Sequence, residues 1–380
     1  MERFKHLVAA SLLALSALCT AEPGVSDNAI TLGMSAPLSG TNGAYGSEMQ
    51  QTIQAYFAQV NAAGGINGRK LELVALDDGY ETERAVANTQ SLIKDKQAFA
   101  LLSFFGSSPT EATMNKVFGP AGVPLVGTIS GAPTLRQPIA QNPNSRFMFH
   151  VRASYLDETS AIVNQLVALG IRNIAVLYQN DGFGQAGLDG VTAALQKHEL
   201  KPAAVGTVER NAIDVSAAVQ AISKASPQAV VMVSLYKPTS AFVRAMKQAG
   251  QHPMFMTVSP VGTEQLVQEL GKEARGIGIS QVVPYPWNDT IPVVREYQKL
   301  AAKAGQYSYY GLEAYITARV MVEGLRRSGR DLSREKLVSA LESINNVDFG
   351  GYRVSYSNSA RSGSRFVEMT VIGPGGKLLR

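Results

Sequence analysis

The 380-residue chain contains a single cysteine, Cys19, and only four histidines. One cysteine excludes a disulfide framework, an iron–sulfur cluster and a cysteine-based zinc site within one chain. After the first 21 residues, no apolar run approaches the roughly 20 residues that a membrane-spanning helix needs. The 35 basic residues exceed the 30 acidic ones without forming a dense cluster, so the sequence does not indicate a nucleic-acid-binding groove.

Recognised catalytic motifs are also missing. The chain has no Gly-x-Ser-x-Gly elbow, no His-Glu-x-x-His pair and no Walker loop. His150, His198 and His252 have no neighbours at the spacing of a metal site or a catalytic triad. The sequence therefore predicts neither an enzyme nor a metal site.

Two sequence patterns resemble functional motifs but are better explained by structural roles. Gly182–Gly187 fits the dinucleotide pattern Gly-x-Gly-x-x-Gly, but three residues separate it from the preceding strand, and no carboxylate ends the next strand. We therefore expect no cofactor. Asp77 and Asp78 are adjacent and point in different directions, so we expect loop or capping carboxylates and not an acid/base pair.

The first 21 residues have the pattern of a secretory signal. Arg3 and Lys5 precede the apolar run Leu7–Leu18, and the small residues of Cys19–Ala21 suit a signal peptidase. We predict a signal peptide over residues 1–21 and a periplasmic protein. The alternative is a lipoprotein lipidated at Cys19, which Leu18 disfavours because small residues usually precede such a cysteine.

Strand-like and helical segments alternate to about residue 345. Strict alternation predicts an α/β fold of mostly parallel sheets with helices on both faces. Two similar series favour two lobes, with a seam near 150–153, over the alternative of one eight-unit barrel. The expected strands include Ile30–Met34, Leu71–Leu76, Phe99–Ser103, Val123–Val126, Phe147–Val151, Ile174–Tyr178, Ala203–Val208, Ala229–Val233 and Met254–Thr257.

The C-terminal part departs from the alternation. Three helices are expected in succession, at Ile291–Ala304, Tyr310–Arg327 and Arg334–Ile344. Tyr352–Tyr356 and Phe366–Ile372 then alternate like antiparallel strands.

A serine-rich strand end gives the clearest sign of binding. In Ser107–Glu111, Ser108 is expected to cap a helix, with Pro109 in the first turn and Glu111 completing a capping box. Ligands of parallel α/β proteins lie beyond strand carboxyl ends, where free N–H groups attract anions. The loop Thr128–Gly131 should lie nearby. A purely structural cap remains the alternative for Ser108.

Four segments, Ala36–Gly40, Tyr45-Gly46, Asn61–Lys70 and Asp77-Asp78, together resemble the leucine/isoleucine/valine-binding protein family, the type I periplasmic substrate-binding proteins of ABC importers. The resemblance covers essentially the whole chain after the signal. It implies two lobes joined by three hinge crossovers near 150–153, 281–285 and 350–354, closing around a ligand. The implied lobes are residues 22–150 with 285–350, and 151–284 with 351–380.

The resemblance also implies binding positions in the first lobe. The serine that takes the ligand carboxylate matches Ser108, within one residue of Ser107. The second strand-end loop matches Ile129, Ser130 and Gly131.

Aromatic positions follow from the same resemblance. Tyr45 matches the ring that covers the ligand, Phe183 matches a tyrosine of the branched-chain members, and Tyr236 falls near a second aromatic position. Ser259 departs from the family, because branched-chain binders place there a glutamate that takes the α-ammonium group. An unpaired ammonium in a desolvated cleft costs about 1–3 kcal/mol or more.

This departure leaves two alternatives for the ligand. Either the ligand is a carboxylate without an α-ammonium group, or Asp181 or Glu158 replaces the missing charge. Arg152 and Tyr155 are further pocket candidates, although a hinge role suits Arg152 equally well.

We therefore expect a non-enzymatic component of an ABC importer. It would capture a branched-chain or other amino acid, or a related organic or aromatic acid, and pass it to a membrane permease. The alternative is an exported sensor or adaptor that uses the same fold for signalling.

Overall fold

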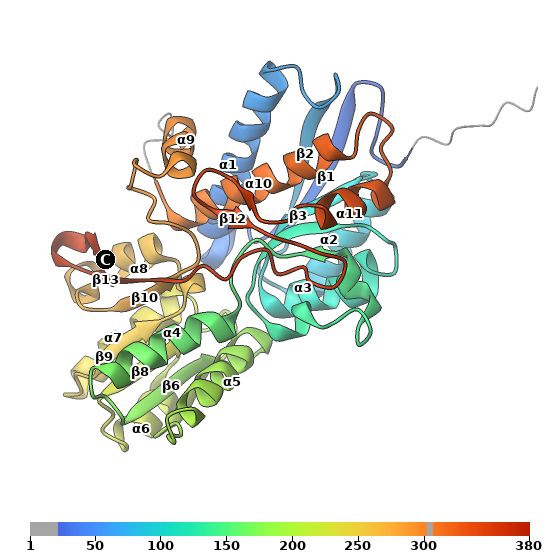
Figure 1. Ribbon diagram of the computed structural model, residues 1–380. Coiled ribbons are helices and arrows are strands. Elements are labelled where there is room, and N and C mark those ends of the chain that lie inside the picture. The colour runs from blue at the N-terminus through green and yellow to red at the C-terminus, as the bar shows by residue number, and fades with distance from the viewer. Residues whose placement is uncertain (1–21, 302–306) are drawn as a thin grey trace, which may run out of the picture.

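A computed structural model describes residues 22–301 and 307–380. Two lobes, each built on one β-sheet, are connected by several passages of the chain (Figure 1). The predicted signal peptide and the last residues of the expected helix Ile291–Ala304 lie outside the described residues.

The first lobe contains a parallel sheet in the order β2-β1-β3-β4-β5. All six residues of β3 are buried, as expected for a central strand between two helix layers. Its strands are β1 (Ala29–Ala36), β2 (Lys70–Asp77), β3 (Ala100–Phe105), β4 (Leu125–Ile129) and β5 (Met148–Phe149). Its helices are α1 (Gly43–Ala62), α2 (Thr82–Lys94), α3 (Ser107–Thr113), which a π-helical turn (Met114–Phe118) extends, α9 (Pro292–Ala301), α10 (Tyr309–Arg327) and α11 (Arg334–Glu342).

The second lobe contains a seven-stranded sheet in the order β14-β13-β10-β9-β8-β6-β7. Strands β6 to β10 are parallel, whereas β13 runs antiparallel to β10 and β14. The strands are β6 (Ile174–Gln179), β7 (Val205–Val208), β8 (Ala229–Val233), β9 (Met254–Thr257), β10 (Gly278–Gln281), β13 (Glu368–Ile372) and β14 (Leu378–Leu379). The helices are α4 (Tyr155–Ala168), α5 (Gly182–Gln196), α6 (Ser216–Ser223), α7 (Tyr236–Gln248) and α8 (Thr263–Leu270).

The predicted two-lobed α/β architecture is confirmed, and the differences lie at element ends. Helix α7 begins at Tyr236, three residues before the start at Thr239 that the sequence suggests, and Pro238 lies in its first turn. Strand β5 has only two residues, since the chain leaves the sheet after Phe149. The C-terminal strands separate: β12 (Arg353–Val354) pairs with β11 (Val347–Asp348), and β13 joins the second lobe.

Three crossovers connect the lobes. The first joins β5 to α4, and the second joins β10 to α9. The third lies between β12 and β13, beyond the expected 350–354, because residues 347–354 form the β11–β12 hairpin. In Figure 1 this third passage is the red chain that runs between the lobes.

Side chains and backbone groups tie the crossovers together. The single O–H of Tyr352 is shared between two carbonyl oxygens. One is that of Val151 at 2.9 Å, in the first crossover, and the other that of Val282 at 3.1 Å, in the second. The His150 N–H donates to the Arg361 carbonyl at 2.8 Å, so the first and third crossovers also pair directly. The hinge is therefore a bundle of chains held by hydrogen bonds.

We predict that Tyr352→Phe lowers the free energy of unfolding by about 1–3 kcal/mol, because two crossover carbonyls lose a buried donor. Urea denaturation measures the change. Tyr356→Phe is the matched control. It removes a 2.9 Å bond to the His150 carbonyl, which keeps the Gly363 N–H as a donor. An equal or larger loss for Tyr356→Phe would contradict the bridging role of Tyr352.

Candidate functional site

The carboxyl ends of the parallel strands in both lobes are followed by residues that meet at the lobe boundary. Such strand ends are where α/β proteins bind their ligands. Several hydrogen bonds cross the boundary there. They include Gly182 N–H to Ser108 Oγ at 3.0 Å, the Tyr45 hydroxyl to the Val261 carbonyl at 2.7 Å, and the Tyr236 hydroxyl to the Thr41 carbonyl at 3.0 Å. The structure is therefore a closed form in which the two lobes contact each other.

Two buried serines of the first lobe form the floor of the boundary. The hydroxyls of Ser107, after β3, and Ser130, after β4, lie 2.7 Å apart. The next residue, Gly131, accepts a hydrogen bond from the Tyr155 N–H at 2.9 Å. A Cβ atom on Gly131 would lie 2.4 Å from that nitrogen, so only glycine fits beneath the start of α4.

The expected capping role of Ser108 is wrong. Helix α3 begins at Ser107, two residues before the start that a Ser108 cap implies. Gly106, with φ of 88°, takes the cap position, and no side chain caps the helix. Glu111 accepts a hydrogen bond from the Thr134 hydroxyl at 3.0 Å and does not complete a capping box. The Ser108 hydroxyl is consequently directed to the second lobe, where it accepts from the first N–H of α5.

Aromatic rings form one wall of the boundary. Tyr45 is stacked on Phe105 with ring centres 5.2 Å apart, and Tyr310 and Tyr236 lie 4.9 and 5.8 Å from it. Burial raises the pKa of Tyr45 well above its ordinary value, so its hydroxyl stays a donor. Phe105 and Tyr310 were not predicted. The position of Phe105 at the end of β3 could have indicated it.

The expected Phe183 and Tyr155 also come together. Their ring centres lie 5.3 Å apart, and both side chains are buried. Because Phe183 is the second residue of α5 and Tyr155 the first of α4, this pair joins two helix starts of the second lobe. Tyr236, by contrast, is partly exposed.

Asp77 and Asp78 organise the loop after β2, as expected of capping carboxylates. Against the raising effect of burial, hydrogen bonds from Ser39, Leu38 and Gly79 lower the pKa of Asp77 to about 2. Burial raises the pKa of Asp78 to about 6.

Tyr80, two residues after Asp78, was missed from the sequence. It adopts φ of 65°, and its buried hydroxyl accepts from Gln179 Nε2 at 3.0 Å across the boundary. Arg210 of the second lobe lies 5.4 Å above its ring. Tyr80 is thus a further side chain that joins the lobes.

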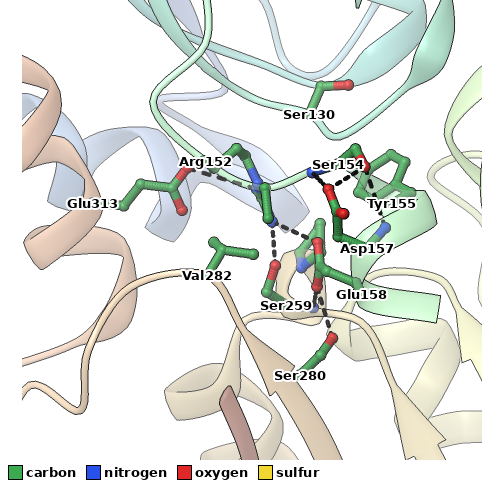
Figure 2. Close-up of polar contacts among 12 residues, drawn as sticks. Ser130, Arg152, Ser154, Tyr155, Asp157, Glu158, Ser259, Ser280, Val282 and Glu313 are labelled. Carbon is green, nitrogen blue, oxygen red and sulfur yellow. Dashed lines mark hydrogen bonds and ion pairs between the residues drawn. The ribbon is translucent and has the colours of Figure 1, made fainter. Parts of the chain in front are cut away.

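A buried charge cluster lies at the first crossover (Figure 2). Arg152, 1% exposed, lies 3.1 Å from Glu158 of α4 and 3.7 Å from Glu313 of α10. Arg152 also donates to the Ser259 hydroxyl. Burial raises the pKa of Glu313 to about 7, against the lowering effect of Arg152. Near neutral pH, Glu313 therefore holds a proton for part of the time.

Glu158 is fully engaged by this cluster. Besides Arg152, its carboxylate accepts from the Ser259 N–H at 2.8 Å and from the Ser280 hydroxyl at 2.7 Å. Asp181 is engaged in the same way. It caps α5 by accepting from the N–H groups of Phe183 and Gly184, and it pairs with Arg210 at 2.9 Å. Both carboxylates that the sequence offered for an ammonium group already have partners.

No group of three or more histidine, cysteine or acidic side chains in residues 22–301 and 307–380 could hold a metal ion. None of the helices described is long and apolar enough to cross a membrane.

Comparisons with known proteins extend the similarity over most of the chain. The sequence profile of the periplasmic binding protein family matches residues 29–371. An amino acid binding protein of Pseudomonas aeruginosa is 27% identical over 272 residues, 70% of each chain. A possible leucine/isoleucine/valine-binding protein of Rhodopirellula baltica is 30% identical with a TM-score of 0.86, covering 95% of this chain and 98% of that one. A substrate-binding periplasmic protein of Ralstonia solanacearum is 31% identical with a TM-score of 0.85, covering 92% and 99%.

We predict that Glu313→Gln changes how stability depends on pH. Glu313 stabilises the fold fully below about pH 4.5, its ordinary pKa, and this contribution is lost as the pH rises through about 7. Glutamine stays neutral, so the variant should gain more than about 1 kcal/mol relative to the wild type between these limits. Urea denaturation across this pH range measures the difference.

Glu158→Gln is the comparison variant. It removes the carboxylate that balances the buried guanidinium, and it should lower stability by about 3–5 kcal/mol at neutral pH. Identical pH profiles for the two variants would show that the two carboxylates are equivalent, contrary to the arrangement described.

Proposed function

The chain belongs to the periplasmic binding protein family, and we propose that it captures a small carboxylate-bearing solute between its lobes and delivers it to the permease of an ABC importer. The protein works outside the cytoplasm, consistent with its family and with the signal pattern of residues 1–21. It performs no chemistry on the solute.

The contact between Ser108 and Gly182 carries this proposal. A hydroxyl of the first lobe lies 3.0 Å from the N–H that opens the 15-residue helix α5 of the second lobe. A carboxylate placed there could accept from both groups at once, and the positive end of the helix dipole would stabilise its charge. Because these donors approach one another only when the lobes close, the solute would favour the closed form by its differential affinity.

The charges around Ser259 narrow the class of solute. An α-ammonium group near Ser259 would meet the Arg152 guanidinium, while Glu158 and Asp181 are already paired. Leaving such an ammonium without a partner costs at least about 1–3 kcal/mol. The rings of Tyr45, Phe105 and Tyr310 offer an apolar wall instead. The solute is therefore an organic or aromatic acid without an α-ammonium group.

A thermal-shift comparison of matched acids tests the solute class. The ligand-stripped protein is measured with leucine against 4-methylpentanoate, and with phenylalanine against 3-phenylpropanoate. An acid at 100 times its dissociation constant adds about 2.7 kcal/mol to the free energy of unfolding, which shifts the melting temperature by several degrees. We expect shifts from the deaminated acids only. Larger shifts from the amino acids would overturn the assignment.

We predict that Ser108→Ala weakens binding of the acid that gives the largest shift by more than about tenfold, because a hydrogen bond to a charged group contributes about 1.5–3 kcal/mol. Isothermal titration calorimetry measures the affinity. Ser339→Ala, on the exposed side of α11, is the control and should bind as the wild type does. Unchanged affinity in Ser108→Ala would place the carboxylate elsewhere.

A further inference from the structure

A cavity lies beside the hinge, apart from the boundary residues described above. It has a volume of about 170 Å³ and is bordered by the segment after β4, by β5 and by the third crossover. Its polar lining includes Arg136, Ser145, His150, Arg361 and Ser362. The volume is sufficient for a small polyatomic ion.

Arg136 brings an unbalanced positive charge to this cavity. Within residues 22–301 and 307–380, no carboxylate lies within 4.0 Å of its guanidinium, although buried charges are normally paired. Its terminal nitrogens donate to the Ser362 hydroxyl at 2.9 Å and to the carbonyls of Ser130, Arg152 and Ala153 at 3.2–3.3 Å. Its buried Nε–H has no partner among the described residues.

His150 contributes an acceptor to the same cavity. The side chain is 1% exposed, and its Nε2 lies 2.9 Å from the Leu135 carbonyl, so that nitrogen carries the proton. Burial, together with the positive charges of Arg136 and Arg152, holds the pKa of His150 well below its usual range. The neutral ring therefore presents a lone pair at Nδ1, which has no donor within the described chain.

The other charged groups around the cavity are paired. Arg361 binds Glu342, and Arg152 lies against Glu158 and Glu313. Asp157, on a neighbouring surface that Arg136 also borders, pairs with Arg365 at 2.9 Å. Among the described residues, the positive charge of Arg136 is therefore unpaired, the Nε–H of Arg136 lacks an acceptor, and His150 Nδ1 lacks a donor.

We propose that this hinge cavity is a second binding site, for a small oxyanion that carries a hydroxyl group, such as hydrogen phosphate. One anionic oxygen accepts from the Arg136 Nε–H, and the hydroxyl of the anion donates to His150 Nδ1. Sulfate and chloride supply no such hydroxyl near neutral pH, so the site discriminates against them. The hydroxyls of Ser145 and Ser362 complete the polar lining.

The site also reaches the hinge. The same guanidinium holds the carbonyls of Arg152 and Ala153 in the first crossover and the Ser362 hydroxyl in the third. An anion bound to Arg136 is therefore in a position to make lobe opening depend on its concentration. This inference does not depend on the identity of the solute bound between the lobes.

Titration calorimetry with sodium phosphate, sodium sulfate and sodium chloride tests the proposal, at matched ionic strength near neutral pH, on protein freed of phosphate. We expect saturable one-to-one binding of phosphate and at least about tenfold weaker binding of sulfate and chloride. Crystals grown with arsenate, a hydroxyl-bearing analogue, should show an anomalous peak between Arg136 and His150. Equal affinity for phosphate and sulfate, or an ordered water alone in the cavity, would overturn the proposal.

Paired variants locate the site. Arg136→Lys keeps the charge but removes the Nε–H donor, and it should weaken phosphate binding by about tenfold or more. Arg146→Lys is the same substitution at an exposed pair with Glu335 and should leave phosphate binding unchanged. His150→Gln is the second test variant, used if Arg136→Lys does not fold. It removes the Nδ1 acceptor, while its amide can still donate to the Leu135 carbonyl. Phosphate binding that survives both Arg136→Lys and His150→Gln would refute the site.

Discussion

The buried guanidinium of Arg152 is the constraint on which the arrangement of the two lobes depends. It lies in the first crossover, and its carboxylate partners come from different lobes, Glu313 on α10 and Glu158 on α4. A charge removed from water must be neutralised and hydrogen-bonded, or its desolvation penalty destabilises the fold. Because Glu158 and Glu313 reach Arg152 from different lobes, these contacts couple the position of one lobe to that of the other. The Ser259 contact extends this coupling to the loop after β9.

The pairing of its carboxylates explains the chemical character of the boundary. Glu158 and Asp181 are engaged by arginines and backbone N–H groups. In the proposed binding mode, the groups that meet the solute are therefore serine hydroxyls, the start of α5 and aromatic rings. Neutral hydroxyls lose less on desolvation than ionised side chains do, so they can be exposed when the lobes open and buried when they close. A binding protein must release its solute, and a boundary of neutral groups is compatible with repeated opening.

The sequence predicted what depends on local pattern. Alternating apolar runs predicted both sheets, the antiparallel character of the C-terminal β13, and the strand-end positions of Ser107, Ser108 and Ser130. Contacts between distant segments could not be predicted. The sequence around Ser108 fits a capping box. In the folded chain, however, the Ser108 hydroxyl accepts a hydrogen bond from the Gly182 N–H of the other lobe. Likewise, no local pattern links Glu313 to Arg152, because their proximity depends on how α10 packs after the second crossover.

The hinge illustrates the difference between local sequence patterns and contacts between distant segments. Its crossovers are short irregular segments without a periodic signal, and polar groups hold them: the Tyr352 hydroxyl joins two carbonyls, and Arg136 joins three. Hydrogen bonds to carbonyls can exchange partners as backbone torsions change, whereas close apolar packing resists such movement. Arg136 also holds the carbonyl of Ser130, whose hydroxyl meets Ser107 at the boundary. A change at the hinge cavity would therefore reach the strand-end serines through a single residue.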